Sequence, residues 1–163
     1  MAPTPANNIA YTAPINPGSV TPVLTYAQVW AGLERKIRAG EEFVGGAIIS
    51  TDVLSESETE HGQPVTMREV VFREGNRRVQ ERCIAFKPMK VEFHQHDGSK
   101  VQNIVSEGAN GELYMTYAFE WLHPELDADG LEKRKVQEWK IGKMAVEKTI
   151  EVMRQMVVDG RLK

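Results

Sequence analysis

The chain has 163 residues, enough for one domain with a substantial buried core. Its 20 basic and 23 acidic side chains give a formal net charge of -3, which offers no electrostatic reason to expect binding to nucleic acid or to an anionic membrane. The single cysteine, Cys83, excludes an internal disulfide, and the chain does not start with a basic segment followed by an apolar run, so we expect a cytoplasmic protein.

The first part of the chain predicts a leader, a strand and a helix. Residues 1–7 are rich in proline, alanine and asparagine, so we expect a flexible leader before a single domain over residues 8–163. Residues 9–15 alternate as a first strand does. A helix should then begin at Thr25, because Thr25 and Gln28 have the spacing of a capping box, and it should end at Gly40.

The central part of the chain predicts six strands joined by tight turns. Apolar residues alternate with polar ones, and glycine or asparagine marks the turns. The predicted strands cover residues 47–54, 65–73, 78–86, 91–95, 101–106 and 112–122.

The C-terminal part predicts one long amphipathic helix over residues 129–163, roughly 45 Å in length at 1.5 Å per residue. Gly142 lies in the middle of its apolar side, where a glycine indicates either close packing or room for a ligand. The predicted buried stripe is Leu131, Lys135, Trp139, Gly142, Val146, Ile150, Met153 and Val157.

The hairpin turns predict which side chains face inward. Pairing Glu107 with Glu112 places Gln102 opposite Tyr117 and Ile104 opposite Met115 on the inner face. Pairing Glu74 with Arg77 places Arg68 and Glu81 as diagonal neighbours inside, with Glu69 opposite Arg82 outside. A slip of one residue in either hairpin would reverse these assignments.

The order of strand, helix, six strands and long helix resembles the helix-grip fold of the START and SRPBCC superfamily, and more narrowly the AtaL-like family. The resemblance implies an α+β fold in which a curved seven-stranded antiparallel sheet wraps around the C-terminal helix and an apolar cavity. It also implies a role in fungal secondary-metabolite biosynthesis. The glycine-rich loop of the plant pollen-allergen members is missing, so no plant-type ligand is implied. The segments that carry the resemblance are residues 15–17, 24–33, 67–72, 79–82, 103–105 and 111–117.

Inside such a cavity, Arg68, Glu81 and Tyr117 are the candidate catalytic residues. A buried guanidinium can stabilise negative charge on a carbonyl oxygen, while a carboxylate or phenol moves a proton. The alternative is that Arg68 and Glu81 form a structural ion pair. The candidate ligand-binding residues are Phe72, Phe93, Gln102, Ile104, Met115, Phe119, Trp139 and Gly142.

Two functions remain open at this point. The first is a cyclase or isomerase that acts on a hydrophobic small molecule, and the second is a non-catalytic carrier of a lipid-like or polyketide-like ligand. His94 and His96 lack a third ligand, so we expect no metal site. No dinucleotide or phosphate-binding motif is present, so we expect no cofactor. The sequence leaves open whether the protein is a monomer or a homodimer.

Overall fold

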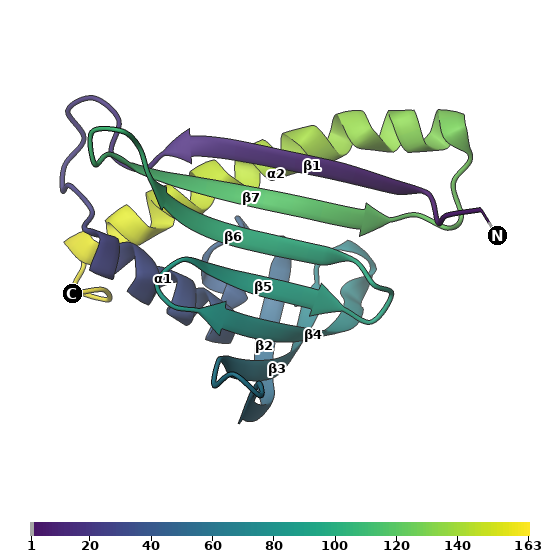
Figure 1. The fold of residues 1–163 in the computed structure, drawn as a ribbon, viewed down its shortest axis with the longest axis horizontal. Helices are drawn as coiled ribbons and strands as arrows, with labels where there is room; N and C mark the ends of the chain where they lie inside the picture. The colour runs from purple at the N-terminus through teal and green to yellow at the C-terminus, as the bar shows by residue number, and fades with distance from the viewer. Residues whose placement is uncertain (1) are drawn as a thin grey trace.

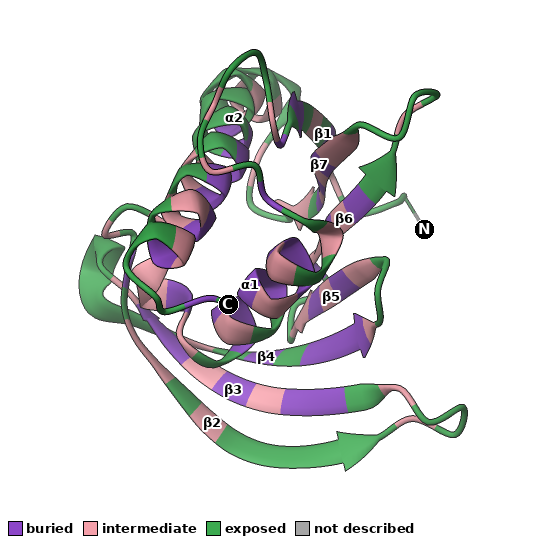
Figure 2. Ribbon diagram, turned by 90° about the vertical axis from the view of Figure 1, so that its left-hand side faces the viewer, coloured by how far each residue is buried: buried purple, intermediate pink, exposed green. Residues whose placement is uncertain are grey.

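The computed structural model describes residues 2–163 and contains one seven-stranded antiparallel sheet, with strand order β1-β7-β6-β5-β4-β3-β2, and two α-helices in this range. The sheet is curved, and both helices lie on its concave side (Figures 1 and 2). The predicted fold class is therefore confirmed. None of the helices in the described range is long and apolar enough to span a bilayer. The elements are β1 (Ala6–Pro14), α1 (Tyr26–Arg38), η1 (Gly40–Glu42), β2 (Ile48–Glu58), β3 (Pro64–Phe72), η2 (Glu74–Asn76), β4 (Arg77–Phe86), β5 (Lys90–Gln95), β6 (Lys100–Glu107), β7 (Leu113–Leu122) and α2 (Ala128–Val158).

The ends of the early elements follow local chemistry. Strand β1 begins at Ala6 and Asn7 is 3% exposed, so the ordered structure starts within the segment expected to be a flexible leader. Helix α1 begins after Thr25, whose hydroxyl accepts from the Gln28 amide while the Gln28 side chain accepts from the Thr25 amide. This is the predicted capping box.

The turn between β6 and β7 differs from the prediction by one residue. Glu107 pairs with Leu113, because Glu112 belongs to the turn, where its carboxylate accepts from the Asn110 amide. Asn103 therefore lies opposite Tyr117, and Val105 opposite Met115. Since side chains alternate along a strand, Gln102 and Ile104 point to the outer face, and the prediction that they face inward is wrong.

The turn between β3 and β4 is two residues longer than predicted. Residues 74–76 form the short helix η2, in which Gly75 has φ 68 and Asn76 has φ 49. Arg68 is consequently directly opposite Glu81 rather than diagonal to it, and Glu69 lies opposite Gln80 rather than Arg82. A shift of two residues keeps every side chain on its predicted face, so the inward placement of Arg68 and Glu81 stands.

Helix α2 crosses the sheet, and its C-terminal half is buried more completely than its N-terminal half (Figure 2). The predicted stripe is observed at Gly142, Val146, Ile150 and Met153. Trp139, predicted to lie against the sheet, is instead 42% exposed. The preceding residue, Glu138, occupies the buried side at 4% exposure, because its carboxylate has hydrogen-bond partners there.

The two helices pack closely through a glycine. A Cβ atom added at Gly32 in α1 would lie 2.8 Å from Cε of Met153 in α2, closer than real Cβ contacts. A larger side chain at position 32 would require the Met153 side chain to move, so Gly32 allows α1 to pack closely against the buried half of α2.

Candidate functional site

A group of buried charged and polar side chains lies between α1 and the concave face of the sheet. Lys36 of α1, Arg68 of β3, Glu81 of β4 and Asn103 of β6 are all buried, at 7%, 4%, 5% and 0% exposure. Phe93 and Tyr117 supply aromatic rings to the same group. We call these six residues the charged cluster. Charged side chains are seldom buried without a partner or a function, so this cluster is the candidate site.

Arg68 and Glu81 form a two-point ion pair at the centre of the charged cluster. The Nε and Nη2 atoms of Arg68 donate to Oε1 of Glu81 at 3.0 and 2.7 Å. Gln95 donates from Nε2 to the other carboxylate oxygen, Oε2, at 3.1 Å. The hydrogen bonds to the Glu81 carboxylate therefore come from residues of the sheet.

Arg68 also joins the sheet to the end of α1. Its Nη1 atom donates to the backbone oxygens of Lys36 and Ile37, at 2.9 Å each. These carbonyls lie in the last turn of α1, where a helix leaves its oxygens without internal partners and carries a partial negative charge. Four of the five guanidinium N–H groups are thus occupied within the protein. One N–H on Nη2 has no partner in the part of the chain that the structure describes.

Lys36 has a different environment, because its recorded hydrogen-bond partner is neutral. Nζ of Lys36 donates to Oδ1 of Asn103 at 2.7 Å, and it lies 4.6 Å from the ring centre of Tyr117 and 5.1 Å from that of Phe93. Burial, together with the nearby charge of Arg68, lowers the pKa of Lys36 to about 7. A large fraction of the amine is therefore uncharged at neutral pH.

The remaining titratable groups near the cluster hold their protons. The Tyr117 hydroxyl donates to Oγ1 of Thr149 in α2 at 2.7 Å, and burial raises the pKa of this phenol. Burial also raises the pKa of the Cys83 thiol to about 12. At neutral pH Tyr117 can donate a proton in a hydrogen bond but does not act as a base, and Cys83 is not a thiolate.

The predicted ligand-binding residues divide into three groups. Phe93, Met115 and Phe119 belong to the buried core on the concave side. Gln102 and Ile104 lie on the convex side, where Gln102 accepts from Lys90.

The third group consists of Phe72 and Trp139, which are only partly buried, and of Gly142, which packs against a ring. Phe72 is half-buried under the guanidinium of Arg77, 4.8 Å from the ring centre, and Trp139 is 42% exposed. A Cβ atom at Gly142 would lie 3.1 Å from Cε2 of Phe119. The glycine therefore makes room for the Phe119 ring, which is the packing interpretation of Gly142 rather than the ligand one.

Sequence reasoning missed Lys36, Asn103 and Thr149, although each lies on a recognisable pattern. Lys36 is seven residues after Val29 and three after Leu33, on the apolar side of α1. Asn103 shares one face of β6 with Val101 and Val105. A charged or amide side chain within an apolar stripe is the signal that could have identified them.

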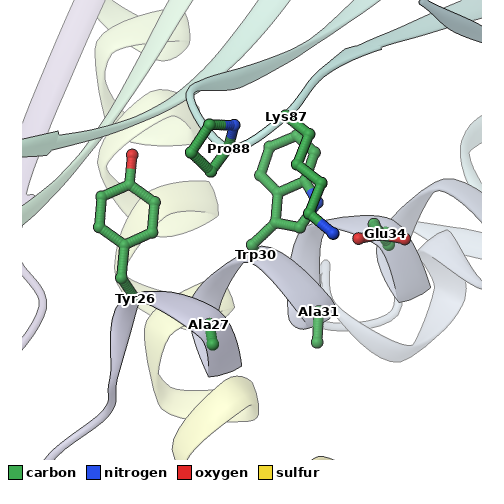
Figure 3. Close-up of a pocket in the computed structure, with 7 residues that line it drawn as sticks. All are labelled: Tyr26, Ala27, Trp30, Ala31, Glu34, Lys87 and Pro88. Atoms are coloured by element: carbon green, nitrogen blue, oxygen red, sulfur yellow. The ribbon is translucent and has the colours of Figure 1, made fainter.

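Two hollows on the surface lie away from the charged cluster. One, of about 390 Å³, lies between α1 and the β4–β5 turn and is lined by Tyr26, Ala27, Trp30, Ala31, Glu34, Lys87 and Pro88 (Figure 3). The other, of about 400 Å³, is lined by Gly62, Gln63, Pro64, Ala85, Phe86, Lys87 and Met89. Neither hollow contains a predicted ligand-binding residue, so the predicted internal cavity stays a prediction.

A second buried polar group fastens the N-terminal half of α2. The Glu138 carboxylate lies 2.8 Å from Nε2 of His123 and accepts from Nδ2 of Asn7 at 2.6 Å. Asn7 also donates to the backbone oxygen of Leu131. These contacts join β1, α2 and the loop after β7, which indicates a structural role.

Comparison with known proteins agrees with this architecture. Residues 9–160 match the model of the family described as AtaL, acetylaranotin biosynthesis cluster protein L. No curated protein sequence matches the chain.

Solved structures show the same fold at low sequence identity. XoxI from Bacillus cereus has a TM-score of 0.56 and 12% identity, over 96% of this chain and 97% of its own. The di-domain ARO/CYC StfQ from the steffimycin biosynthetic pathway has a TM-score of 0.65 and 5% identity, over 96% of this chain and 52% of its own. Ara h 8.0201 has a TM-score of 0.52 and 11% identity, over 90% of this chain and 99% of its own. Identities this low show the fold alone.

Proposed function

Because the chain belongs to the AtaL family, we propose that it binds a hydrophobic biosynthetic intermediate in its interior and promotes the cyclisation or isomerisation of that molecule by acid/base chemistry. We further propose that the protein is cytoplasmic, acts in fungal secondary-metabolite biosynthesis and requires no cofactor. The solved structure of StfQ, a di-domain ARO/CYC, supports the reaction class by analogy of fold.

The observation that carries the proposal is the charged cluster itself. Lys36, Arg68 and Glu81 bring two basic groups and one carboxylate into an interior otherwise built from apolar side chains. A buried ion pair contributes little net stability compared with apolar residues of similar volume. Fixed charges in a dry site, in contrast, stabilise a developing oxyanion strongly.

In the proposed reaction, Glu81 is the base and Arg68 stabilises the negative charge that forms on the ligand. An oxygen of Glu81 takes a proton from the carbon next to a ligand carbonyl, and the unused Nη2 N–H of Arg68 donates to the resulting enolate oxygen. The enolate carbon then attacks a second carbonyl of the same molecule, whose C=O π bond opens to an alkoxide as the ring closes. The proton held by Glu81 passes to this alkoxide, which restores the carboxylate. The Tyr117 phenol keeps its proton and, in the proposed reaction, transfers its hydrogen bond from Thr149 to a ligand oxygen.

A carrier function is the second candidate, and one observation favours it. Arg68 already donates to Glu81 and to two carbonyls of α1, so the pair has a structural use without any substrate. In that case the interior binds the intermediate and shields it from water, with no chemical step.

The test compares inner and outer ion pairs on the same two strands. The first step is native mass spectrometry of the protein purified from its producing cells, to identify a co-purifying molecule. Ring closure of that molecule is then measured for Arg68→Met and Glu81→Gln. The matched controls are Arg78→Met and Glu69→Gln, since Arg78 donates to Glu69 at 2.9 Å on the opposite face of β3 and β4.

The two candidate functions predict different results. If the inner variants fold but lose ring closure by a factor of at least about 100, while the outer variants retain it, the pair is catalytic. If all four variants retain turnover, the proposed chemistry is wrong. If the folded wild-type protein binds the molecule without changing it, the carrier function is correct.

A further inference from the structure

Lys36 is a basic group without an acidic partner. No ion pair among the described residues 2–163 includes Lys36, and the nearby Glu81 carboxylate is already held by Arg68 on Oε1 and by Gln95 on Oε2. Its Nζ atom instead donates to the neutral amide oxygen of Asn103 at 2.7 Å. The cluster therefore contains two basic groups and one carboxylate, an imbalance that disfavours the charged form of the amine.

The aromatic rings beside Lys36 favour its charged form, and burial together with the charge of Arg68 outweighs them. Phe93 lies next to both basic side chains, since Lys36 Nζ is 5.1 Å and Arg68 Cζ is 4.8 Å from its ring centre. Cys83 of β4 and Tyr117 of β7 complete the surroundings, and burial keeps both of them protonated and uncharged at neutral pH. Desolvation first, and then repulsion from Arg68, lowers the pKa of Lys36 to about 7, against a partial opposing effect of the Glu81 carboxylate.

Asn103 supplies an independent observation that points to a ligand. The residue is 0% exposed, its Oδ1 accepts from Lys36, and its buried Nδ2 atom has no hydrogen-bond partner within residues 2–163. An unpartnered buried amide N–H₂ costs free energy, because it has lost its water. An oxygen of a bound molecule beside Lys36 would satisfy this donor.

We infer that Lys36 is a nucleophilic amine that condenses with a ketone carbonyl of a β-dicarbonyl ligand, while Asn103 Nδ2 holds the second carbonyl oxygen of the same ligand. A desolvated lysine next to another basic group is a recognised way to activate an amine for Schiff-base chemistry. A structural role explains the position less well, because an apolar residue of similar volume would be at least as stable there.

The condensation balances without any oxidant or reductant. The Nζ lone pair attacks the carbonyl carbon, and proton transfer from nitrogen to oxygen gives a carbinolamine. The C–O bond then breaks, the hydroxyl leaves as water with the remaining proton of the nitrogen, and a C=N bond forms. A proton then moves from the carbon between the two carbonyls to the nitrogen and gives a conjugated enaminone, whose remaining carbonyl oxygen is the atom that Asn103 would bind. Addition of water reverses the sequence.

This inference rests on the proposed function in one respect, which is that the interior admits a hydrophobic ligand. It does not require ring closure or the acid/base tasks given to Arg68 and Glu81. Carbonyl capture by Lys36 and acid/base catalysis by Arg68 and Glu81 can therefore fail separately, and the experiment below distinguishes them.

The probe is 2,4-pentanedione, the smallest common β-diketone, added to the intact protein at pH 7. The expected result is near-ultraviolet absorbance of an enaminone, a mass gain of one diketone minus one water, and peptide mapping of that mass to Lys36. The rate should depend on pH with a midpoint near 7, because only the uncharged amine reacts. Lys36→Met and Lys36→Arg should lose the adduct by a factor of at least about 100.

The matched control is Lys143→Met, since Lys143 has a side chain that is 60% exposed on α2 and should leave the Lys36 adduct unchanged. Adducts that form only on exposed lysines, or a Lys36→Met variant that reacts like the wild type, would overturn the inference. If a hydrophobic fluorophore binds the interior but the diketone does not label Lys36, carbonyl capture is wrong, whereas the ligand binding required by the proposed function stands. If the diketone labels Lys36 while Arg68→Met and Glu81→Gln keep full turnover, capture stands and the acid/base proposal fails.

Discussion

At the scale of single residues, the buried amine of Lys36 makes the stability of the protein depend on pH. The unfolded chain has a lysine of ordinary pKa, 10.5, whereas the folded protein lowers the pKa of Lys36 to about 7. Between these values the unfolded state binds more protons than the folded state, so the free energy of unfolding rises with pH across this window. Below pH 7 both states are protonated, and the folded state carries the full cost of a buried charge.

The variant Lys36→Met should therefore be more stable than the wild type at pH 7, and the difference should shrink as the pH approaches 10. The expected difference at pH 7 is on the order of a few kcal/mol, because methionine removes the buried charge without leaving a large void. Urea unfolding of both proteins at several pH values measures it. Lys143→Met is the control and should follow the wild type at every pH. A difference that stays constant with pH would contradict the lowered pKa.

At the scale of elements, α2 stabilises the fold through its C-terminal half. Val146 is 0% exposed and Met153 is 1% exposed, whereas Val136, further toward the N-terminus, is 59% exposed. The N-terminal half is held mainly by polar contacts, in which Glu138 accepts from Asn7 and lies beside His123. The two halves of one helix should therefore respond differently to the same substitution.

Val146→Asp should prevent folding. The substitution buries an unpaired carboxylate, which costs several kcal/mol, and a domain of this size has a total stability of roughly 5–15 kcal/mol. Circular dichroism and the yield of monodisperse protein measure the effect. Ile150→Asp should give the same result, since Ile150 is 7% exposed. Val136→Asp is the matched control and should fold normally, and a stably folded Val146→Asp variant would show that α2 is not packed against the sheet as described.

At the scale of the whole molecule, a curved sheet carries both helices on its concave side (Figure 2), and the residues of the charged cluster are buried in this arrangement. The sheet supplies Arg68, Glu81, Asn103 and Tyr117 from four different strands, and α1 supplies Lys36. Helix α2 packs closely at Gly142, beside Phe119 of β7, and through Met153, beside Gly32 of α1.

The whole-molecule prediction is that a hydrophobic fluorophore binds in this interior at micromolar concentration, with a blue shift and saturation at one molecule per chain. The residues expected to line it are Phe93, Met115 and Phe119. A fluorescence titration measures the binding. The control is Ala31→Arg, which blocks the surface hollow of Figure 3 and should leave the affinity unchanged. If that variant loses the signal, the dye occupies the surface hollow and the internal binding site is wrong.

The sequence by itself determined the order and kind of the elements. The capping box at Thr25, the alternation in the strands and the spacing of apolar residues in α2 are local signals, because each depends on hydrogen bonds or burial within a few residues. The inward placement of Arg68 and Glu81 also followed from the sequence. It survived an error of two residues in the β3–β4 turn because side chains alternate with a period of two.

Tertiary structure decided the composition of the candidate site. The carboxylate of Glu112 places that residue in the β6–β7 turn, and this single-residue shift turns Gln102 outward and Asn103 inward. Lys36 becomes part of the site only because α1 packs over β6, where Asn103 is its partner 67 positions along the chain. Contacts between residues so far apart depend on strand register and helix position together, and a one-residue change in register reverses the face of every side chain, so local sequence patterns cannot determine them.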